Sequence, residues 1–351
     1  MSGARPREDA AVEFDPAKLD AFLREAVPGL AGAMRLQRVS GGQSNPTFFV
    51  SYDNRRLVLR KKPPGEILPS AHAVDREYRI LTALAETDVP VPRTILFHES
   101  PNVVGTPFYV MERLEGRVFA ECALPGHAPG QRRAIYLSMA QTMARLHKVD
   151  WQAVGLQGFG KPGNYFARQI ARWTKQWQLS KTRDIPEIDW LTEWLPQHIP
   201  PGDETTIAHG DFRLGNLMFD PERLQVIGVL DWELSTLGHP LADVAYNCIA
   251  WRTFPSEFGG LRGRDLTELG IPSEAEYLDH YYREAGRTSG IGPFHMAFSM
   301  FRLAVIFEGI AARALQGNAV AQDAAEKGEL SVVFARRAVE AAQGDIPAPG
   351  S

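Results

Sequence analysis

Two short apolar segments that each run into an aspartate place the strongest limit on what this 351-residue chain can fold into. Residues 206–208 lead into His-Gly-Asp-Phe-Arg-Leu-Gly-Asn, in which the aspartate is Asp211 and the asparagine is Asn216. Residues 226–230 lead into Asp231, twenty positions after Asp211. Short apolar runs between turn residues predict short strands. We therefore expect the three polar side chains to meet where a loop and the following hairpin approach each other.

The spacing of these side chains favours phosphoryl transfer. That reaction needs a carboxylate that orients the attacking hydroxyl, and oxygen ligands that hold metal ions on the nucleotide phosphates. Asn216 follows Asp211 by five positions, which is the distance between the catalytic aspartate and the metal-binding asparagine of a kinase catalytic loop. A turn or cap role explains each aspartate singly. It does not explain the loop, the intervening strands and Asp231 together.

The order of predicted elements divides the chain into two lobes, because 351 residues exceed what one small core organises. Hydrophobic periodicity and Gly, Pro, Asn and Asp punctuation predict the first set of elements: a helix at 15–27, strands at 34–40, 47–52 and 56–61, a helix at 70–87, and strands at 95–98 and 108–111. After that the chain turns mainly helical: 131–148, 164–179, 187–198, 241–251, 273–287, 292–315 and 321–343. The prediction is an α+β fold with a small antiparallel-sheet lobe over 1–113, including the N-terminal helix, and a helical lobe over 114–351.

The sequences HGDFRLGN and LDWE resemble the motifs of aminoglycoside phosphotransferases, choline kinases and related small-molecule kinases, and the resemblance covers roughly residues 36–250. It implies a two-lobed protein-kinase-like fold with ATP and Mg²⁺ as cofactors. It also implies Asp211 as the catalytic base and Asn216 and Asp231 as magnesium ligands. In the same motifs, His209 is a structural loop residue, and we expect Asp243 to brace the catalytic loop.

The smaller lobe supplies candidates for nucleotide binding. Gly41, Gly42 and Ser44 join the first two predicted strands, where a glycine turn brings backbone N–H groups against phosphate oxygens, although the same turn also suits a plain hairpin. Glu112 and Arg113 fall at the expected hinge between the lobes, where backbone groups face adenine.

A cation on the third strand should grip the phosphates, with a carboxylate on the next helix holding it. By resemblance Arg60 or Lys61 is that cation and Glu77 is its partner. Successive side chains on a strand point to opposite faces, so only one of the two cations can face the nucleotide. We favour Arg60 and leave Lys61 as the alternative.

Longer stretches, among them FYVMERLEGRVF and VLDWELSTLGHPLADVAY, resemble the kinase-like domains that some larger proteins carry fused to acyl-CoA dehydrogenase domains. This branch implies a hydroxyacyl-CoA acceptor and a functional link to an acyl-CoA dehydrogenase, without flavin chemistry in this chain. We expect the acceptor in the helical lobe near Asp211. Aromatic and arginine side chains on predicted helices are the candidates to bind it: Tyr165, Arg168, Trp173, Arg302 and Arg313.

Two other functions fit the same motifs. The first is a kinase for an aminoglycoside or another amino alcohol, which would need acidic rather than basic side chains around a polycationic acceptor. The second is a nucleotide-binding pseudokinase, which would have little reason to keep all of Asp211, Asn216 and Asp231. The sequence leaves open the acceptor, the choice between ATP and GTP, and the oligomeric state.

Composition excludes several classes of protein. The formal net charge of -4 argues against nucleic-acid binding, and 44% hydrophobic residues predict a folded globular chain. The two cysteines, Cys122 and Cys248, have neither metal-ligand spacing nor a disulfide framework, which suits a reducing compartment. The N-terminal residues lack an apolar leader and no later run predicts a membrane helix, so we expect a cytoplasmic protein.

Overall fold

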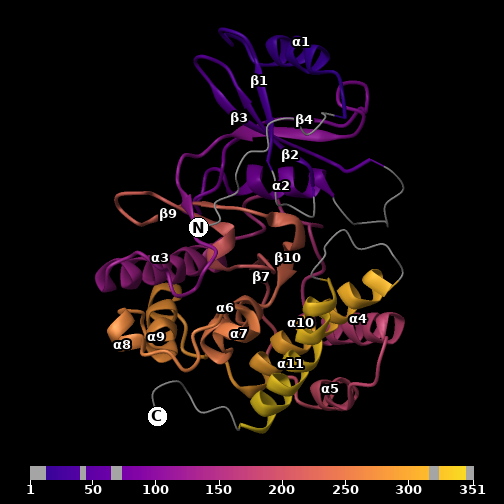
Figure 1. Cartoon of the computed structure of the whole chain (residues 1–351), viewed down its shortest axis with the longest axis vertical. Coiled ribbons are helices and arrows are strands. Elements are labelled where there is room, and N and C mark those ends of the chain that lie inside the picture. The colour runs from indigo at the N-terminus through magenta and orange to yellow at the C-terminus, as the bar shows by residue number, and fades with distance from the viewer. Residues whose placement is uncertain (1–12, 40–44, 65–72, 316–323, 345–351) are drawn as a thin grey trace.

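The computed structural model describes residues 13–39, 45–64, 73–315 and 324–344, and it has two lobes stacked along its long axis (Figure 1). The upper lobe holds a five-stranded antiparallel sheet in the order β1-β2-β3-β5-β4. Its elements are α1 (Pro16–Ala26), β1 (Arg35–Arg38), β2 (Thr47–Ser51), β3 (Arg56–Lys61), α2 (Val74–Leu84), β4 (Thr94–His98) and β5 (Phe108–Glu112). The predicted order of strands and helices in this lobe is confirmed.

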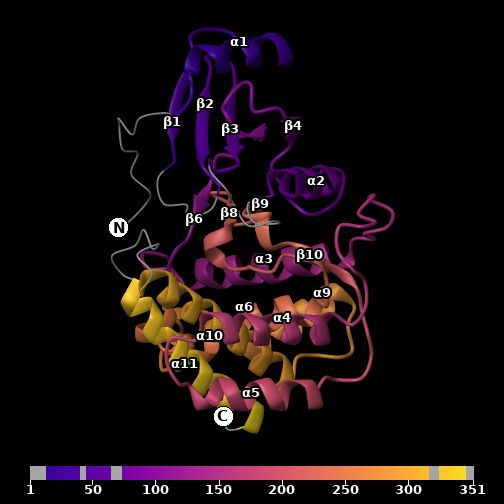
Figure 2. The same ribbon diagram turned by 90° about the vertical axis from the view of Figure 1, so that its right-hand side faces the viewer.

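Alternation along β3 decides which side chains face the second lobe. Leu57 and Leu59 belong to a cluster with Leu19 and Leu23 of α1, which covers the outer face of the sheet. Val58 instead joins the cluster that continues into the lower lobe. The turned view shows α2 lying between the sheet and the helices below it (Figure 2). The sheet therefore presents alternate residues of β3 to the junction of the lobes.

The lower lobe is mainly helical, as predicted. Its helices are α3 (Pro129–Lys148), α4 (Tyr165–Ser180), α5 (Pro186–Gln197), α6 (Pro240–Arg252), α7 (Pro255–Phe258), α8 (Leu266–Leu269), α9 (Glu274–Ala285), α10 (Pro293–Leu315) and α11 (Ala324–Gln343), with single turns of 3₁₀ helix at η1 (Leu214–Asn216) and η2 (Trp232–Leu234). Short strands cross its top: β6 (Arg117–Val118), β8 (Leu217–Phe219) and β9 (Val226–Val229) form one sheet, and β7 (Thr206–Ala208) pairs with β10 (Thr236–Gly238).

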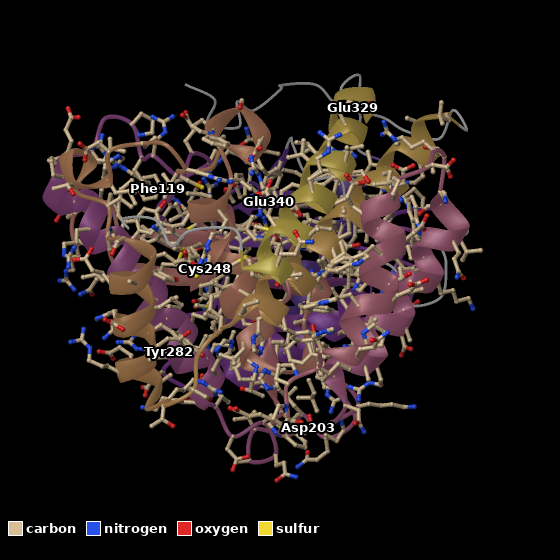
Figure 3. All side chains as sticks on the ribbon, turned by 90° about the horizontal axis from the view of Figure 1, so that it is seen from below. Phe119, Asp203, Cys248, Tyr282, Glu329 and Glu340 are labelled. Carbon is tan, nitrogen blue, oxygen red and sulfur yellow. The ribbon has the colours of Figure 1, made fainter. Side chains whose placement is uncertain are left out.

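Helix α10 is the central helix of this lobe. Its length and hydropathy would suffice to cross a membrane, whereas the sequence analysis expected no segment that is long and apolar enough to do so. However, 89% of its most apolar window is buried inside the protein. It packs along α11 and also contacts α4 and α6. Seen from below, α11 runs from one edge of the lobe, near Glu329, towards its centre, near Glu340 (Figure 3).

One hydrophobic core joins the lobes. The larger cluster contains Val58 and Tyr109 from the sheet, Leu81 from α2 and most of the buried residues of the helical lobe. The smaller cluster lies between α1 and the outer face of the sheet. The division of the chain at residue 113 stays a prediction, because apolar packing is continuous across that point.

Candidate active site

The catalytic loop predicted from the sequence begins where β7 ends at Ala208. Gly210 has a φ of +83°, and a Cβ there would lie 2.8 Å from the backbone oxygen of Leu234. Only glycine therefore fits both the backbone conformation and the space. Leu234 belongs to η2, directly after Asp231, so this close approach packs the loop against the segment that carries the second carboxylate.

Asp211 lies within a set of hydrogen-bond donors. The side-chain amide of Asn216 donates to its Oδ2 at 2.7 Å, and the Nε of Arg213 lies 3.2 Å from Oδ1. The hydroxyl of Tyr246, on α6, also donates to Oδ1. About a fifth of the Asp211 side chain is exposed, which leaves the carboxylate open to a small molecule. The structure thus brings Asp211 and Asn216 into direct contact.

Asp231 enters the site from the other side. It has a φ of +63°, in the left-handed region that aspartate tolerates better than most residues, and this turn starts η2. Its Oδ1 lies 3.2 Å from a terminal nitrogen of Arg60 on β3. An ion pair therefore joins the two lobes beside the catalytic loop.

Arg60 and Lys61 point to opposite faces of the sheet. The Nε of Arg60 lies 3.0 Å from Glu77 of α2, whose buried carboxylate also accepts a hydrogen bond from the Tyr109 hydroxyl at 2.9 Å. Burial opposes the charge of Arg60, but the carboxylates of Glu77 and Asp231 raise its pKa above the usual value. Lys61 donates to the backbone oxygen of Val104 at 2.7 Å on the outer face. Of the two predicted cations, only Arg60 faces Asp231.

A cavity of about 350 Å³ lies between the sheet and the top of the helical lobe. Arg60, Glu77, Glu112, Arg113 and Asp231 all line it, together with apolar side chains of β2, β3 and β5. Arg113 also lies over the ring of a β2 phenylalanine, 3.8 Å from its centroid. The size of the cavity and its apolar walls with a few polar groups are those of a small-molecule site.

Asp243 and His209 hold the two catalytic segments together. Asp243 accepts hydrogen bonds from the backbone N–H groups of His209 and Gly210, at 2.6 and 2.9 Å. Burial opposes its charge, but the hydrogen bond from His147, the electrostatic effect of His147 and His209, and the N–H of Gly210 bring its pKa below the usual value. The His209 ring lies 2.9 Å from the backbone oxygen of Leu230, directly before Asp231. The geometry gives both residues bracing positions.

The predicted acceptor residues lie in different places. Arg302 is buried and donates to the backbone oxygen of Gly210, so it lies against the catalytic loop, and its guanidinium lies over the ring of Trp173. Tyr165 is packed against Gly238 and Phe298. Two of the expected arginines lie elsewhere: Arg168 donates to the backbone oxygen of Lys161 at 2.6 Å, and Arg313 is exposed near the end of α10. In the described residues neither of these arginines has a hydrogen bond or ion pair to the catalytic loop.

Three predicted site residues cannot be placed, and three others were not predicted. Gly41, Gly42 and Ser44 fall outside the described residues, so their role stays a prediction. Conversely, Arg213, Tyr246 and Asn247 were assigned no role from the sequence. The sequence does carry a signal for Tyr246 and Asn247. They follow Asp243 by three and four positions, and residues at this spacing lie on the same face of a helix.

The geometry of this site agrees with the similarity of the chain to known phosphotransferases. The family model for the phosphotransferase enzyme family matches residues 35–288, which is more than half of the chain. The chain belongs to the phosphotransferase enzyme family. A solved protein from Ralstonia eutropha, provisionally described as an aminoglycoside phosphotransferase, is 46% identical with a TM-score of 0.86, covering 94% of this chain and 99% of its own. The predicted family and kinase-like fold are thereby confirmed.

Other relatives of this phosphotransferase are longer proteins. Acyl-CoA dehydrogenase family member 10 of the mouse is 47% identical over 88% of this chain, and human family member 11 is 40% identical over 89%. The chain spans only 29% and 41% of those two proteins. A thermostable mutant of aminoglycoside phosphotransferase APH(4)-Ia, in a ternary complex with AMP-PNP and hygromycin B, shares the fold: it is 16% identical, with a TM-score of 0.59 over 91% of this chain and 98% of its own.

Proposed function

We propose that this phosphotransferase moves the terminal phosphoryl group of Mg-ATP to a hydroxyl group of a small molecule. The observation that carries the proposal is a chain of contacts: Asn216 binds the Asp211 carboxylate, and its backbone oxygen accepts from Leu230, directly before Asp231. Asp231 in turn lines a cavity together with Arg60 and Glu77. A scaffold that only binds nucleotide has no need for Asp211, because that partly exposed carboxylate is not among the described residues that line the cavity. The pseudokinase alternative is therefore less favoured.

The residues fit a nucleotide with magnesium. The carboxylate of Asp231 and the amide oxygen of Asn216 are hard oxygen ligands, the type that Mg²⁺ takes alongside phosphate oxygens. Magnesium supplies charge neutralisation at the transferred phosphoryl group. Arg60 lies beside Asp231 and is held by Glu77, so its guanidinium is placed to bind phosphate oxygens. The apolar walls between Glu112 and β2 would hold the adenine ring.

Asp211 would act as the general base. The acceptor oxygen forms a bond to the terminal phosphorus while the bond from that phosphorus to the bridging oxygen breaks, which releases ADP. Asp211 orients the acceptor hydroxyl and takes its proton. Arg213 is half exposed and lies next to Asp211, so its guanidinium could move from the Asp211 carboxylate to bind the negatively charged phosphoryl group during transfer.

The leading candidate for the acceptor is a hydroxyacyl-CoA, and among these the 4-hydroxyacyl thioesters are the first to test. Two observations support an anionic acceptor of this class: the relatives that carry acyl-CoA dehydrogenase names, and the buried cation of Arg302 against the catalytic loop. An aminoglycoside would bring several positive charges towards Arg302 and Arg213, which disfavours that acceptor. A link to an acyl-CoA dehydrogenase is part of the same proposal.

The test is an acceptor panel. Purified protein is incubated with Mg-ATP and, in separate reactions, a 4-hydroxyacyl-CoA, simple hydroxy acids, choline and a kanamycin-type antibiotic, and products are identified by mass spectrometry. We expect a phosphorylated thioester, absent with Asp211→Asn protein, which excludes a contaminating kinase. Turnover of the antibiotic alone would overturn the acceptor assignment. Binding of Mg-ATP without transfer to any acceptor would overturn the phosphotransferase assignment itself.

A further inference from the structure

Helix α6 holds the catalytic loop by one face. Its residue Asp243 binds the backbone N–H groups of residues 209 and 210. Three residues later, the hydroxyl of Tyr246 donates to the carboxylate of Asp211. Asn247, in the next position, donates from Nδ2 to the backbone oxygen of Phe212 at 2.9 Å. Four consecutive loop residues are therefore bound, in order, by side chains on one stripe of α6.

Among these contacts only that of Tyr246 reaches the side chain of Asp211. Its hydroxyl bonds Oδ1, while Asn216 bonds Oδ2 at 2.7 Å. A donor on each oxygen fixes the rotation of the carboxylate plane, since turning the plane would break both bonds. Arg213 also contacts the carboxylate, but its side chain is 49% exposed and is not held by burial. Tyr246 and Asn216 are the contacts that keep the plane in place.

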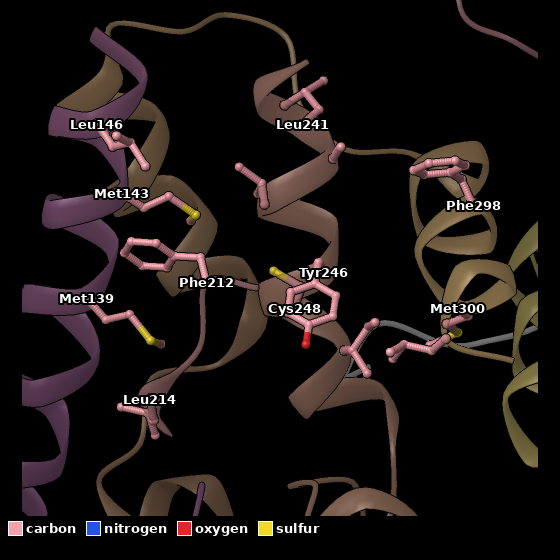
Figure 4. Packing of buried hydrophobic residues seen from close by; sticks show 14 of the residues in the cluster. Met139, Met143, Leu146, Phe212, Leu214, Leu241, Tyr246, Cys248, Phe298 and Met300 are labelled. Atoms are coloured by element: carbon pink, nitrogen blue, oxygen red, sulfur yellow. The ribbon is translucent and has the colours of Figure 1, made fainter. Parts of the chain in front are cut away.

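Tyr246 is itself buried. It is 9% exposed, and its ring lies on α6 among buried side chains of the larger hydrophobic cluster (Figure 4). The guanidinium of Arg302 lies 5.5 Å from the centre of the ring and donates to the backbone of Gly210. Burial, reinforced by the charge of Asp211, raises the pKa of the Tyr246 hydroxyl. The hydroxyl therefore stays protonated and remains a donor.

We propose that Tyr246 is a positioning residue for phosphoryl transfer, which sets the orientation of the Asp211 carboxylate towards the acceptor hydroxyl. The proposal rests on the proposed role of Asp211 as base. Tyr246 does not touch the nucleotide pocket: it is absent from the described residues that line the 350 Å³ cavity. Its removal should therefore act on the chemical step and leave Mg-ATP binding unchanged.

The kinetic test removes one oxygen atom. Tyr246→Phe keeps the ring and its stacking with Arg302, so kcat with a 4-hydroxyacyl-CoA should fall about 10- to 100-fold, the range for loss of a hydrogen bond to a charged group. The KM for Mg-ATP should stay within about twofold. Tyr52→Phe is the matched control, because that buried tyrosine also donates to a carboxylate, Asp20, at 2.7 Å but lies in the other lobe. It should leave kcat unchanged.

Two further comparisons separate positioning from a general structural role. In the Asp211→Asn protein the additional change Tyr246→Phe should have little further effect, because the two residues act through one group. Equal losses from Tyr246→Phe in both backgrounds, or from the Tyr52→Phe control, would overturn the proposal.

A spectroscopic test works without any turnover. With 3-fluorotyrosine at position 246, the ¹⁹F resonance should shift on Asp211→Asn and stay in place on Asp20→Asn. If the wild-type protein transfers phosphate to no acceptor but this shift is seen, the proposed function fails and the contact stands. A ¹⁹F resonance that does not shift on Asp211→Asn would overturn the inference, whether or not the protein transfers phosphate.

Discussion

At the scale of single residues, the catalytic loop depends on the carboxylate of Asp211 and on the missing side chain of Gly210. Asp211 has a donor on each carboxylate oxygen and remains partly exposed, which is the environment of a group that meets a substrate. Gly210, its neighbour, combines a φ of +83° with an approach to Leu234 that excludes a Cβ. Each residue supports a separate prediction.

Asp211→Asn should lower phosphoryl transfer by about 10²- to 10⁴-fold, the range that a general base contributes. The Kd for Mg-ATP should stay nearly unchanged, because the lost charge serves the acceptor. Turnover and isothermal titration measure the two quantities separately. Asp53→Asn, which removes an exposed carboxylate paired with Arg35, is the control and should alter neither. A mild effect of Asp211→Asn on turnover would contradict its role as base.

Gly210→Ala should destabilise the protein by about 1–3 kcal/mol more than Gly158→Ala. Gly158 has a similar φ of +76°, but a methyl group added there would have open space within 4 Å, whereas one added at Gly210 would lie 2.8 Å from Leu234. The comparison therefore isolates the close contact from the backbone strain that both share. Urea denaturation measures it. Equal losses in the two variants would show that the loop moves aside without cost.

At the scale of elements, most of the predicted helices and strands are confirmed within a few residues, because periodicity and capping are local properties. Asp15, for example, accepts a hydrogen bond from the backbone of Ala17 at 2.9 Å and starts α1 with Pro16 in the first turn. The strands β6 and β10, of two and three residues, and the short helices α7 and α8 were not predicted, since elements of this length carry too little pattern. Their positions follow from packing against neighbours.

The buried N-terminal turn of α6 yields a prediction with a defined pH dependence. Because the pKa of Asp243 lies below its usual value of 3.8, its charge stabilises the fold at neutral pH and that contribution disappears as the pH falls below about 4. Asp243→Asn should therefore lower the free energy of unfolding near pH 7, and the difference from wild type should shrink in acid. Urea denaturation at pH 7, 5 and 3.5 measures it. A difference that grows towards acid would contradict the sign.

At the scale of the whole molecule, the lobes share an apolar cluster and the ion pair of Arg60 with Asp231. A nucleotide bound between them would contact both. The free energy of folding should then depend on nucleotide concentration, because a ligand that binds only the folded state stabilises it.

Mg-ADP at one hundred times its Kd should stabilise the protein by about 2.7 kcal/mol, and EDTA should remove most of that effect. Asp231→Ala should abolish the magnesium-dependent part, since a ligand to the metal is lost, while Asp53→Ala should preserve it. Thermal unfolding with and without EDTA is the measurement. Stabilisation of the Asp231→Ala protein equal to that of wild type would exclude Asp231 as a magnesium ligand.

The sequence by itself determined the spacing of Asp211, Asn216 and Asp231 and the order of elements around them, because loop lengths and hydrophobic periodicity depend only on residues close together in the chain. Tertiary structure decided which cation on β3 faces the cavity: α1 covers the face with Lys61, and α2 and the helical lobe meet the face with Arg60. It also decided that Tyr246, 35 positions after Asp211 in the chain, donates to Oδ1 alongside the neighbouring Arg213. Such choices depend on which surfaces pack together, and packing joins residues that are distant in sequence.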